Sequence, residues 1–305
     1  MQVFQQMIIF LLLMLVGAMA RRKNILTEEN QPQITKLIVN IAYPAIILSG
    51  ATGASTHVEG RELLLAFGVV LVLLVLLILS GRFLARVLGF APNERGVVEV
   101  MVIFTNIGFM GVPMIDGIYG KDALIYMTIL LIPFNLLFYS YVMQRIKGTG
   151  TDAQPFTWKS LLNTGMGACV LAILLYLSRI PLPYVLSESI HMLGSMTAPL
   201  AMMLLGSFLL ETDWKSMFHA RMLIFTFLKM LVLPIAIVLF FEQFLDNTYL
   251  LATVMATAAT PSGNVIPLLA ALYNKEAYPV SVDGIALTTA VAVVTMPIVA
   301  LVVGL

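Results

Sequence analysis

The apolar segment 97–118 contains the run Thr105-Asn106-Ile107-Gly108-Phe109-Met110-Gly111-Val112-Pro113, and the segment 249–272 contains Thr260-Pro261-Ser262-Gly263-Asn264-Val265-Ile266-Pro267 about 155 residues later. Each run places prolines, glycines and an asparagine inside a segment that is otherwise apolar. At membrane depth such residues are costly unless they line a cavity or are buried in protein. Two interruptions at corresponding positions of two halves are the best pointer in a sequence to a transporter's binding site. The two runs therefore predict a secondary transporter.

The composition indicates an integral membrane protein. Of the 305 residues, 60% are hydrophobic and only 11% are charged, and the mean hydropathy is +0.98. A soluble domain has roughly 25% charged residues. A membrane span needs about 20 apolar residues. On that basis the sequence predicts an all-α fold with ten transmembrane helices, at 2–20, 35–52, 62–80, 97–118, 123–143, 160–178, 190–210, 222–241, 249–272 and 283–303.

Lysine and arginine are unequally distributed between the two sides of these ten spans. One side has twelve: Arg21, Arg22, Lys23, Arg82, Arg86, Arg95, Arg145, Lys147, Lys159, Lys215, Arg221 and Lys275. The other side has three: Arg61, Lys121 and Arg179. Because the cytoplasmic side of a membrane protein carries the excess of positive charge, we expect a protein of the cytoplasmic membrane with both termini outside.

Proline positions indicate an internal repeat. The pairs are Pro44 with Pro199, Pro113 with Pro267, and Pro133 with Pro297, at offsets of 155, 154 and 164 residues. They divide the chain into two five-helix halves, 1–143 and 160–305, joined by a polar cytoplasmic linker at 144–159. Since five is odd, the second half enters the membrane in the opposite direction, and the repeat is inverted.

At the two interrupted segments the chain resembles the auxin efflux carrier family, which includes plant PIN-type auxin carriers and bacterial carriers of small carboxylates such as malonate. The residues that carry the resemblance are Asn106 with Met110-Gly111-Val112-Pro113 and Tyr119-Gly120, then Pro261 to Pro267 followed by Tyr273-Asn274-Lys275-Glu276. The long cytoplasmic loop of the plant members is missing, and the segment 63–81 has no ionisable residue. The chain is therefore similar to the bacterial members.

The resemblance implies the fold of sodium/proton antiporters, in which the fourth and ninth helices are broken and cross. It also implies a scaffold made of the first, second, sixth and seventh helices and a transport domain made of helices 3–5 and 8–10. The transport domain would move as an elevator, and the scaffold would form a homodimer.

The predicted binding site lies in the two interrupted segments. Unwinding exposes free N–H groups at the start of a half-helix, and these attract a carboxylate. Asn106 and Asn264 each add two donors and one acceptor without a charge. The predicted substrate is a small organic anion, a mono- or dicarboxylate, bound by Asn106, Gly108, Gly111, Pro113, Pro261, Ser262, Gly263 and Asn264. The alternative is that both asparagines only satisfy the broken backbone, as helix caps do.

Lys229 lies near the middle of the segment 222–241. Charges at that depth mark ion or substrate pathways, so we include Lys229 in the predicted substrate site. The alternatives are a structural pair with Glu99 or Asp283, or a side chain that reaches the interface. Glu99, Asp116 and Asp283 are the candidates for proton or ion coupling, because Glu99 and Asp116 flank the first interruption. The alternative for all three carboxylates is a solvated helix end.

Other functional classes fit the sequence less well. It has no nucleophile paired with a base, no metal-ligand cluster and no phosphate-binding loop, so we expect neither an enzyme nor a cofactor, metal or nucleic-acid partner. Membrane lipid, the substrate and a coupling proton or sodium ion are the expected partners. A uniporter, or a sodium-coupled symporter of another organic solute, fits the same fold. A membrane receptor that binds a ligand without moving it is the third alternative.

Overall fold

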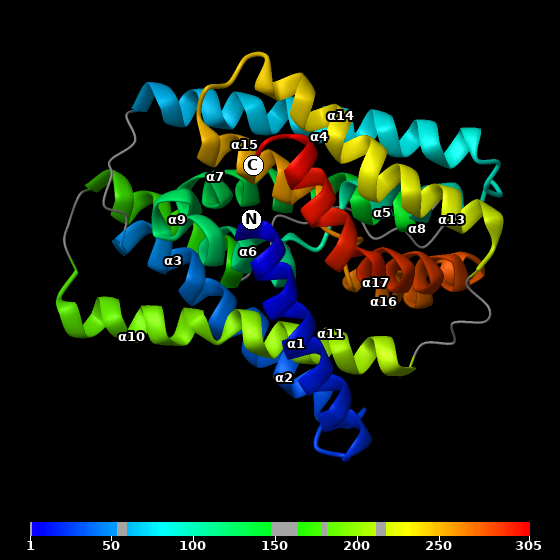
Figure 1. Cartoon of the computed structure of the whole chain (residues 1–305), viewed down its shortest axis with the longest axis horizontal. Coiled ribbons are helices and arrows are strands. Elements are labelled where there is room, and N and C mark those ends of the chain that lie inside the picture. The colour runs from blue at the N-terminus through cyan, green and yellow to red at the C-terminus, as the bar shows by residue number, and fades with distance from the viewer. Residues whose placement is uncertain (1, 54–59, 148–163, 179–181, 212–217) are drawn as a thin grey trace.

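The computed structural model describes residues 2–53, 60–147, 164–178, 182–211 and 218–305. Within these ranges every element of secondary structure longer than an isolated bridge is a helix (Figure 1). The first half contains α1 (Gln2–Arg22), α2 (Gln31–Leu37), η1 (Ile38–Ala42), α3 (Tyr43–Gly53), α4 (Gly60–Val87), α5 (Arg95–Ile103), η2 (Ile107–Gly111), α6 (Val112–Tyr119), α7 (Lys121–Leu137), η3 (Phe138–Val142) and α8 (Met143–Lys147). The second half contains α9 (Thr164–Ser178), α10 (Tyr184–Ser195), α11 (Thr197–Glu211), α13 (Ala220–Phe227), η5 (Leu228–Val232), α14 (Leu233–Glu242), α15 (Thr248–Ala259), α16 (Val265–Tyr273), η6 (Lys275–Ala277) and α17 (Tyr278–Val302).

Seven helices among the described residues are long and apolar enough to cross a membrane. They are Gln2–Arg22, Gln31–Ala51, Gly60–Val87, Lys121–Ile146, Tyr184–Leu210, Ala220–Glu242 and Lys275–Val302. Three shorter apolar helices are Ile107–Tyr119, Thr164–Ser178 and Thr248–Ala259. The prediction of an all-helical, multi-pass membrane protein is therefore confirmed. The count of ten spans stays a prediction, because two of the remaining segments are interrupted and α9 is short.

Three π-helical turns precede prolines. Each ends two residues before the proline: η1 before Pro44, η2 before Pro113 and η5 before Pro234. Proline has no N–H and its ring clashes with the carbonyl one turn earlier. A π-helical turn adds one residue to the turn, so the helix bends around the proline without ending there. The helix therefore continues through Pro113, where the sequence predicted unwinding.

The helices can be described in two groups, which also pack against each other through α3 and α7, α7 and α9, and α1 and α17. In the first group α1 packs against α11, and α3 packs against α9 and α10. In the second group α4 packs against α5 and α7, α14 packs against α15, and α17 packs against η5. In Figure 1 α4 and the α10–α11 pair lie at opposite edges of the molecule.

Glycines permit the closest approach within the first group. A Cβ atom added at Gly17 of α1 would meet the backbone of Met203, and one added at Gly206 of α11 would meet the backbone of Met14. Small residues at such positions let two membrane helices pack backbone to backbone. The α1–α11 pair is therefore a rigid unit of the fold.

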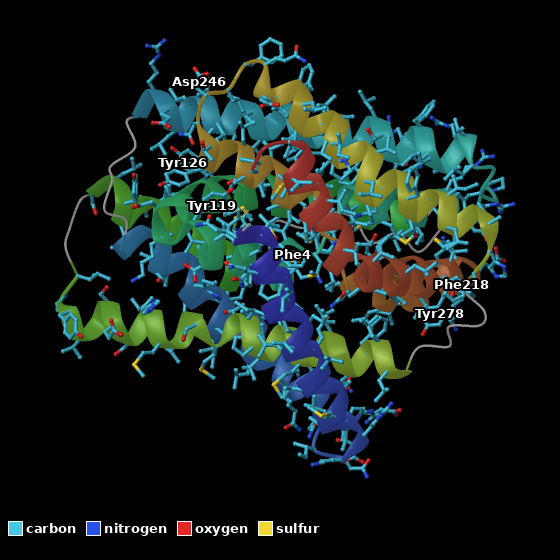
Figure 2. The ribbon with its side chains drawn as sticks, in the orientation of Figure 1. Phe4, Tyr119, Tyr126, Phe218, Asp246 and Tyr278 are labelled. Atoms are coloured by element: carbon cyan, nitrogen blue, oxygen red, sulfur yellow. The ribbon has the colours of Figure 1, made fainter. Side chains whose placement is uncertain are left out.

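The outer helices expose large apolar side chains. Phe4 on α1, labelled in Figure 2, and Leu64 on α4 are more than half exposed. A water-soluble protein rarely exposes large contiguous apolar surface. Here the exposed surface belongs to helices of membrane-spanning length, which indicates that it faces lipid.

Candidate functional site

The two interrupted helices meet at their breaks. The first break separates α5 from η2, and the second separates α15 from α16. Thr105 and Ser262 form an isolated antiparallel bridge. The N–H of Asn106 donates to the carbonyl oxygen of Pro261 at 2.7 Å, and the N–H of Gly263 donates to that of Phe104 at 2.9 Å. Backbone groups freed by one break are therefore satisfied by the other, as membrane depth requires.

Two hydroxyl groups join the breaks in the same reciprocal way. Thr105 Oγ1 donates to the carbonyl of Thr257, in the last turn of α15, at 2.8 Å. Ser262 Oγ donates to the carbonyl of Met101, in the last turn of α5, also at 2.8 Å. The N–H of Ser262 donates to Thr288 Oγ1 at 3.2 Å. Ser262 is fully buried, so it holds the two breaks together and does not line the cavity beside them.

A cavity of about 150 Å³ lies beside the breaks. It is lined by Val39, Tyr43, Phe104, Thr105, Asn106, Gly108, Phe109, Leu131, Phe134, Asn135, Gly263, Asn264 and Val265. Four predicted site residues therefore line one cavity: Asn106, Gly108, Gly263 and Asn264. Its apolar wall is aromatic, since the Phe104 ring lies 5.2 Å from the Phe134 ring and 4.2 Å from the Phe138 ring, centroid to centroid.

Both asparagines precede a half-helix, but neither caps it. Asn106 comes directly before η2 and Asn264 directly before α16, and neither side chain makes a capping hydrogen bond. Instead Asn106 Nδ2 lies 3.5 Å from Asn264 Oδ1. Neither amide therefore caps the broken backbone in this structure, and the binding of a ligand by the two amides stays a prediction. Their polar groups meet at the cavity, next to the positive ends of two half-helices.

Of the two glycines in the cavity lining, one is needed for close packing. A Cβ atom added at Gly263 would lie 2.6 Å from Cδ1 of Phe104 and 3.1 Å from its carbonyl oxygen. A Cβ atom at Gly108 would lie 3.4 Å from the Tyr43 ring. Gly263 has no room for a side chain, because the Phe104 backbone lies so near, whereas Gly108 is only in ordinary contact.

Five predicted site residues lie outside the cavity lining: Ser262, Lys229, Gly111, Pro113 and Pro261. Gly111 has helical backbone angles (φ −64°, ψ −56°), so the prediction of unwound backbone there is wrong. Pro113 is buried within α6, because the π-helical turn η2 absorbs the proline. Pro261 lies in the second break and contributes its carbonyl oxygen to Asn106 N–H.

A family model described as "membrane transport protein" matches residues 2–300. The chain belongs to this family. The resemblance to auxin efflux carriers is thereby confirmed. The uncharacterized transporter YfdV of Escherichia coli is 24% identical over 285 residues, which cover 87% of this chain and 86% of YfdV. The uncharacterized transporter MJ1031 of Methanocaldococcus jannaschii is 28% identical over 219 residues, which cover 65% of this chain and 66% of MJ1031. These matches indicate a membrane transporter rather than an enzyme.

Two cavity residues of this transporter were missed by sequence reasoning. Asn135 lies in α7 and donates its side-chain N–H to the Leu131 carbonyl at 2.8 Å. Tyr43 begins α3 and faces Gly108. Asn135 could have been found by the signal that identified Asn106 and Asn264, which is an amide inside an apolar segment. Tyr43 carried no such signal, because a tyrosine is ordinary at that depth.

Lys229 of the transporter contacts the second break and not the cavity. It lies in η5 and its side chain is 0% exposed. Its Nζ atom donates to the carbonyl oxygen of Thr260 at 2.7 Å and lies 3.6 Å from Met230 Sδ. Lys229 is therefore not a residue of the cavity lining, and its contacts are with the backbone of the broken helix.

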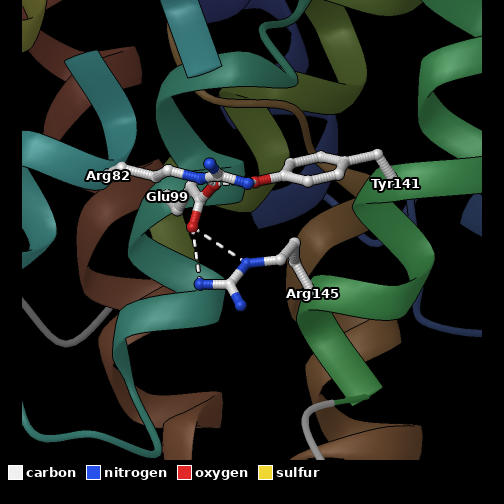
Figure 3. Close-up of polar contacts among 4 residues, drawn as sticks. All are labelled: Arg82, Glu99, Tyr141 and Arg145. Carbon is white, nitrogen blue, oxygen red and sulfur yellow. Dashed lines mark hydrogen bonds and ion pairs between the residues drawn. The ribbon is translucent and has the colours of Figure 1, made fainter. Parts of the chain in front are cut away.

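Glu99 forms an ionic cluster inside the protein (Figure 3). Its side chain is 1% exposed, so the alternative of a solvated helix end is wrong. Arg82 Nε lies 3.1 Å from Oε1, Arg145 Nη2 lies 2.6 Å from Oε2, and the Tyr141 hydroxyl donates to Oε1. Both oxygens of Glu99 are thus occupied by cations, and the alternative pair between Glu99 and Lys229 is not formed.

The two other predicted coupling residues, Asp116 in α6 and Asp283 in α17, are half-buried and do not line the cavity. Among the described residues, no group of three or more His, Cys, Asp or Glu side chains is arranged to hold a metal ion.

Proposed function

We propose that this transporter moves a small organic anion, a mono- or dicarboxylate, across the cytoplasmic membrane. The carboxylate would bind between Asn106 and Asn264. One observation carries the proposal: both amides stand at the start of a half-helix, cap nothing, and meet at a cavity. Amide N–H groups and the positive ends of helices are the donors that favour a carboxylate.

The lack of charged lining residues and the volume of the cavity support a small anion as the substrate. No lining residue carries a formal charge, so the empty site has no charge that must be solvated. A cavity of about 150 Å³ is the size that holds one benzene molecule in a protein interior. The aromatic wall of Phe104, Phe109 and Phe134 would contact the apolar part of the substrate.

The cavity is lined by residues of both packed groups, and this supports an elevator mechanism. In the proposal the protein has ten spans in two inverted halves. Val39 and Tyr43 come from the group that contains α1, α3, α9, α10 and α11. Asn106, Asn135 and Asn264 come from the other group. In the proposed mechanism the first group is the scaffold and the homodimer interface, and the second moves the substrate past it. Both termini would lie outside the cell.

The test is transport into proteoliposomes, measured as substrate-induced current on a solid-supported membrane and as exchange of radiolabelled substrate. The panel is malonate, malate, succinate, lactate and indole-acetate. The variants are Asn106→Ala, Asn264→Ala and their combination. Asn93→Ala is the matched control, because Asn93 is exposed and its amide donates only to Glu276.

We expect at least one carboxylate to be transported by the wild type and the Asn93→Ala control, and by neither Asn106→Ala nor Asn264→Ala. Wild-type transport by the double variant would overturn the proposed site. Absence of both current and exchange for every carboxylate would overturn the substrate class. Uptake that requires sodium would favour the sodium-coupled alternative, and binding without exchange would favour the receptor.

A further inference from the structure

The carbonyl end of α15 is the place in this fold that suits a cation. Thr260 is the residue directly after α15, and its backbone leaves the helical conformation there (φ −65°, ψ 148°). The last carbonyls of a helix carry partial negative charge. In transporters with broken helices, the N-terminal ends of the half-helices face the anionic substrate, and the C-terminal ends coordinate the coupling ion.

Lys229 places a cation at this end. Its Nζ atom is fully buried, and its contacts are the Thr260 carbonyl at 2.7 Å and Met230 Sδ at 3.6 Å. Neither contact is a carboxylate, so the charge of Lys229 is directed at the broken helix and is not cancelled by an ion pair within the described residues. Buried charges in membrane segments are costly and mark ion or substrate pathways.

Two buried hydroxyl groups lie close to Lys229 along the chain or on the residue it bonds to, and neither is hydrogen-bonded to its Nζ atom. Two buried hydroxyl oxygens, Thr226 Oγ1 and Thr260 Oγ1, have no hydrogen-bond partner in the described structure. Thr226 precedes Lys229 by three residues on the same helix, the spacing at which two side chains share one side. An ammonium group has three N–H donors. The Thr260 carbonyl, the one oxygen that Lys229 Nζ contacts, is a hard ligand of the kind that an alkali cation also uses.

Among the residues that the structure describes, no lysine or arginine donates to a carbonyl at the other break. At the carbonyl end of α5, the Phe104 carbonyl accepts the N–H of Gly263 and the Met101 carbonyl accepts the hydroxyl of Ser262. Both groups are neutral donors. In the described structure a lysine therefore bonds to the carbonyl end of one broken helix only, that of α15. The residue it bonds to, Thr260, precedes Asn264 by four residues. This asymmetry indicates a role beyond the hydrogen bonds that hold both breaks.

We infer that Lys229 is a tethered cation, which occupies the position of a coupling sodium ion at the carbonyl end of α15 and makes substrate binding independent of sodium. The inference rests on the proposed function, which supplies the substrate. It goes beyond that function because it assigns a role to Lys229 and excludes sodium as the coupling ion. Lys229 acts on the substrate through the broken helix, as a positioning residue, and does not touch it.

The test uses the full-length protein with Lys229→Met, Lys229→Arg and Lys229→Ala, and Lys275→Met as the control that removes an exposed cation. Alanine at 229 removes three carbons and the ammonium group, which together correspond to propylammonium. Propylammonium is therefore the probe, and 1-propanol is its neutral counterpart. Melting temperature in detergent is measured with sodium, choline, propylammonium or 1-propanol, and uptake of the panel carboxylates is measured with sodium or choline.

We expect wild-type uptake in sodium and in choline to agree within about twofold. We expect Lys229→Met to lose about tenfold or more in apparent affinity, since the Thr260 carbonyl of the second break would lose its buried N–H donor. Lys229→Arg keeps the charge and is expected to retain part of the uptake. Propylammonium, but not 1-propanol, is expected to raise the melting temperature of Lys229→Ala and to leave the wild type unchanged.

Three results would overturn the inference: sodium that stabilises the wild type or accelerates its uptake severalfold, Lys229→Met uptake equal to that of Lys275→Met, or equal stabilisation of Lys229→Ala by 1-propanol. If Lys229→Ala does not fold, the Lys229→Met and wild-type sodium measurements still decide. The melting-temperature measurements need no substrate, so they separate a wrong assignment of Lys229 from a wrong substrate class.

Discussion

Replacing Glu99 by glutamine tests whether the cluster in Figure 3 stabilises the fold or takes part in proton coupling. Glutamine keeps the shape of the side chain but loses its charge. Both oxygens of Glu99 accept hydrogen bonds, from Arg82 Nε at 3.1 Å on one side and from Arg145 Nε and Nη2 at 2.9 and 2.6 Å on the other. The amide NH2 of glutamine must therefore face the N–H groups of an arginine.

The expected cost is worked from these three arginine bonds, since the fourth donor to Glu99, the Tyr141 hydroxyl, can turn to accept a hydrogen bond from the glutamine amide. A hydrogen bond to a charged group contributes about 1.5–3 kcal/mol and a neutral one about 1 kcal/mol, so three bonds lose about 3 kcal/mol. The arginine side chains are 43% and 39% exposed, and solvent screens their interaction with Glu99. We therefore expect a loss of about 2 kcal/mol, or about 4 °C in melting temperature for a chain of this size.

The assay is thermal unfolding in detergent together with uptake at several external pH values. Glu28→Gln is the control, because Glu28 is 85% exposed and pairs with Arg21 at 3.4 Å, an arrangement that contributes about 0–1 kcal/mol. We expect Glu99→Gln to melt lower than the control while the folded fraction keeps the wild-type pH dependence of uptake. An unchanged melting temperature with lost pH dependence would refute the structural role and identify Glu99 as a proton site.

Two further substitutions test the geometry of the cavity. Gly263→Ala is expected to abolish uptake and lower the melting temperature, because the new Cβ atom would lie 2.6 Å from the Phe104 ring. Gly108→Ala is expected to fold normally, because its Cβ atom would lie 3.4 Å from the Tyr43 ring. Equal melting temperatures of the two variants would contradict this expectation. Tyr43→Ala enlarges the cavity on its α3 side, so uptake is expected to shift toward larger carboxylates in competition assays, and an unchanged preference would show that Tyr43 does not limit substrate size.

The membrane-embedded character of the fold and the location of the candidate cavity could be predicted from the sequence. Apolar segments separated by charged connections identify helices, and an amide inside such a segment is costly unless it is buried or lines a cavity. Asn106 and Asn264 could therefore be found, and both line the cavity. Glu99 could not be assigned, because its burial depends on Arg82 and Arg145, which come from distant parts of the chain.

The exact residues at which the first helix breaks could not be predicted. The break lies at Phe104, Thr105 and Asn106, and none of them is a glycine or a proline. Sequence reasoning placed the unwound backbone at Gly111 and Pro113, which are the local helix breakers. In the structure a π-helical turn accommodates Pro113. Local propensity thus indicated that the helix is irregular, and contacts with the second half determine where it opens.

Those contacts explain why the interruptions occur as a pair. An unpaired backbone group at membrane depth costs several kcal/mol, so one break alone would expose N–H and carbonyl groups without partners. Here the Asn106 N–H bonds to Pro261, the Gly263 N–H bonds to Phe104, and the hydroxyls of Thr105 and Ser262 bond to the opposite half-helices. Each break therefore stabilises the other. Because each break supplies the hydrogen-bond partners of the other, the two asparagines are held next to each other at the cavity without serving as helix caps, and in the proposed function their amides bind the substrate.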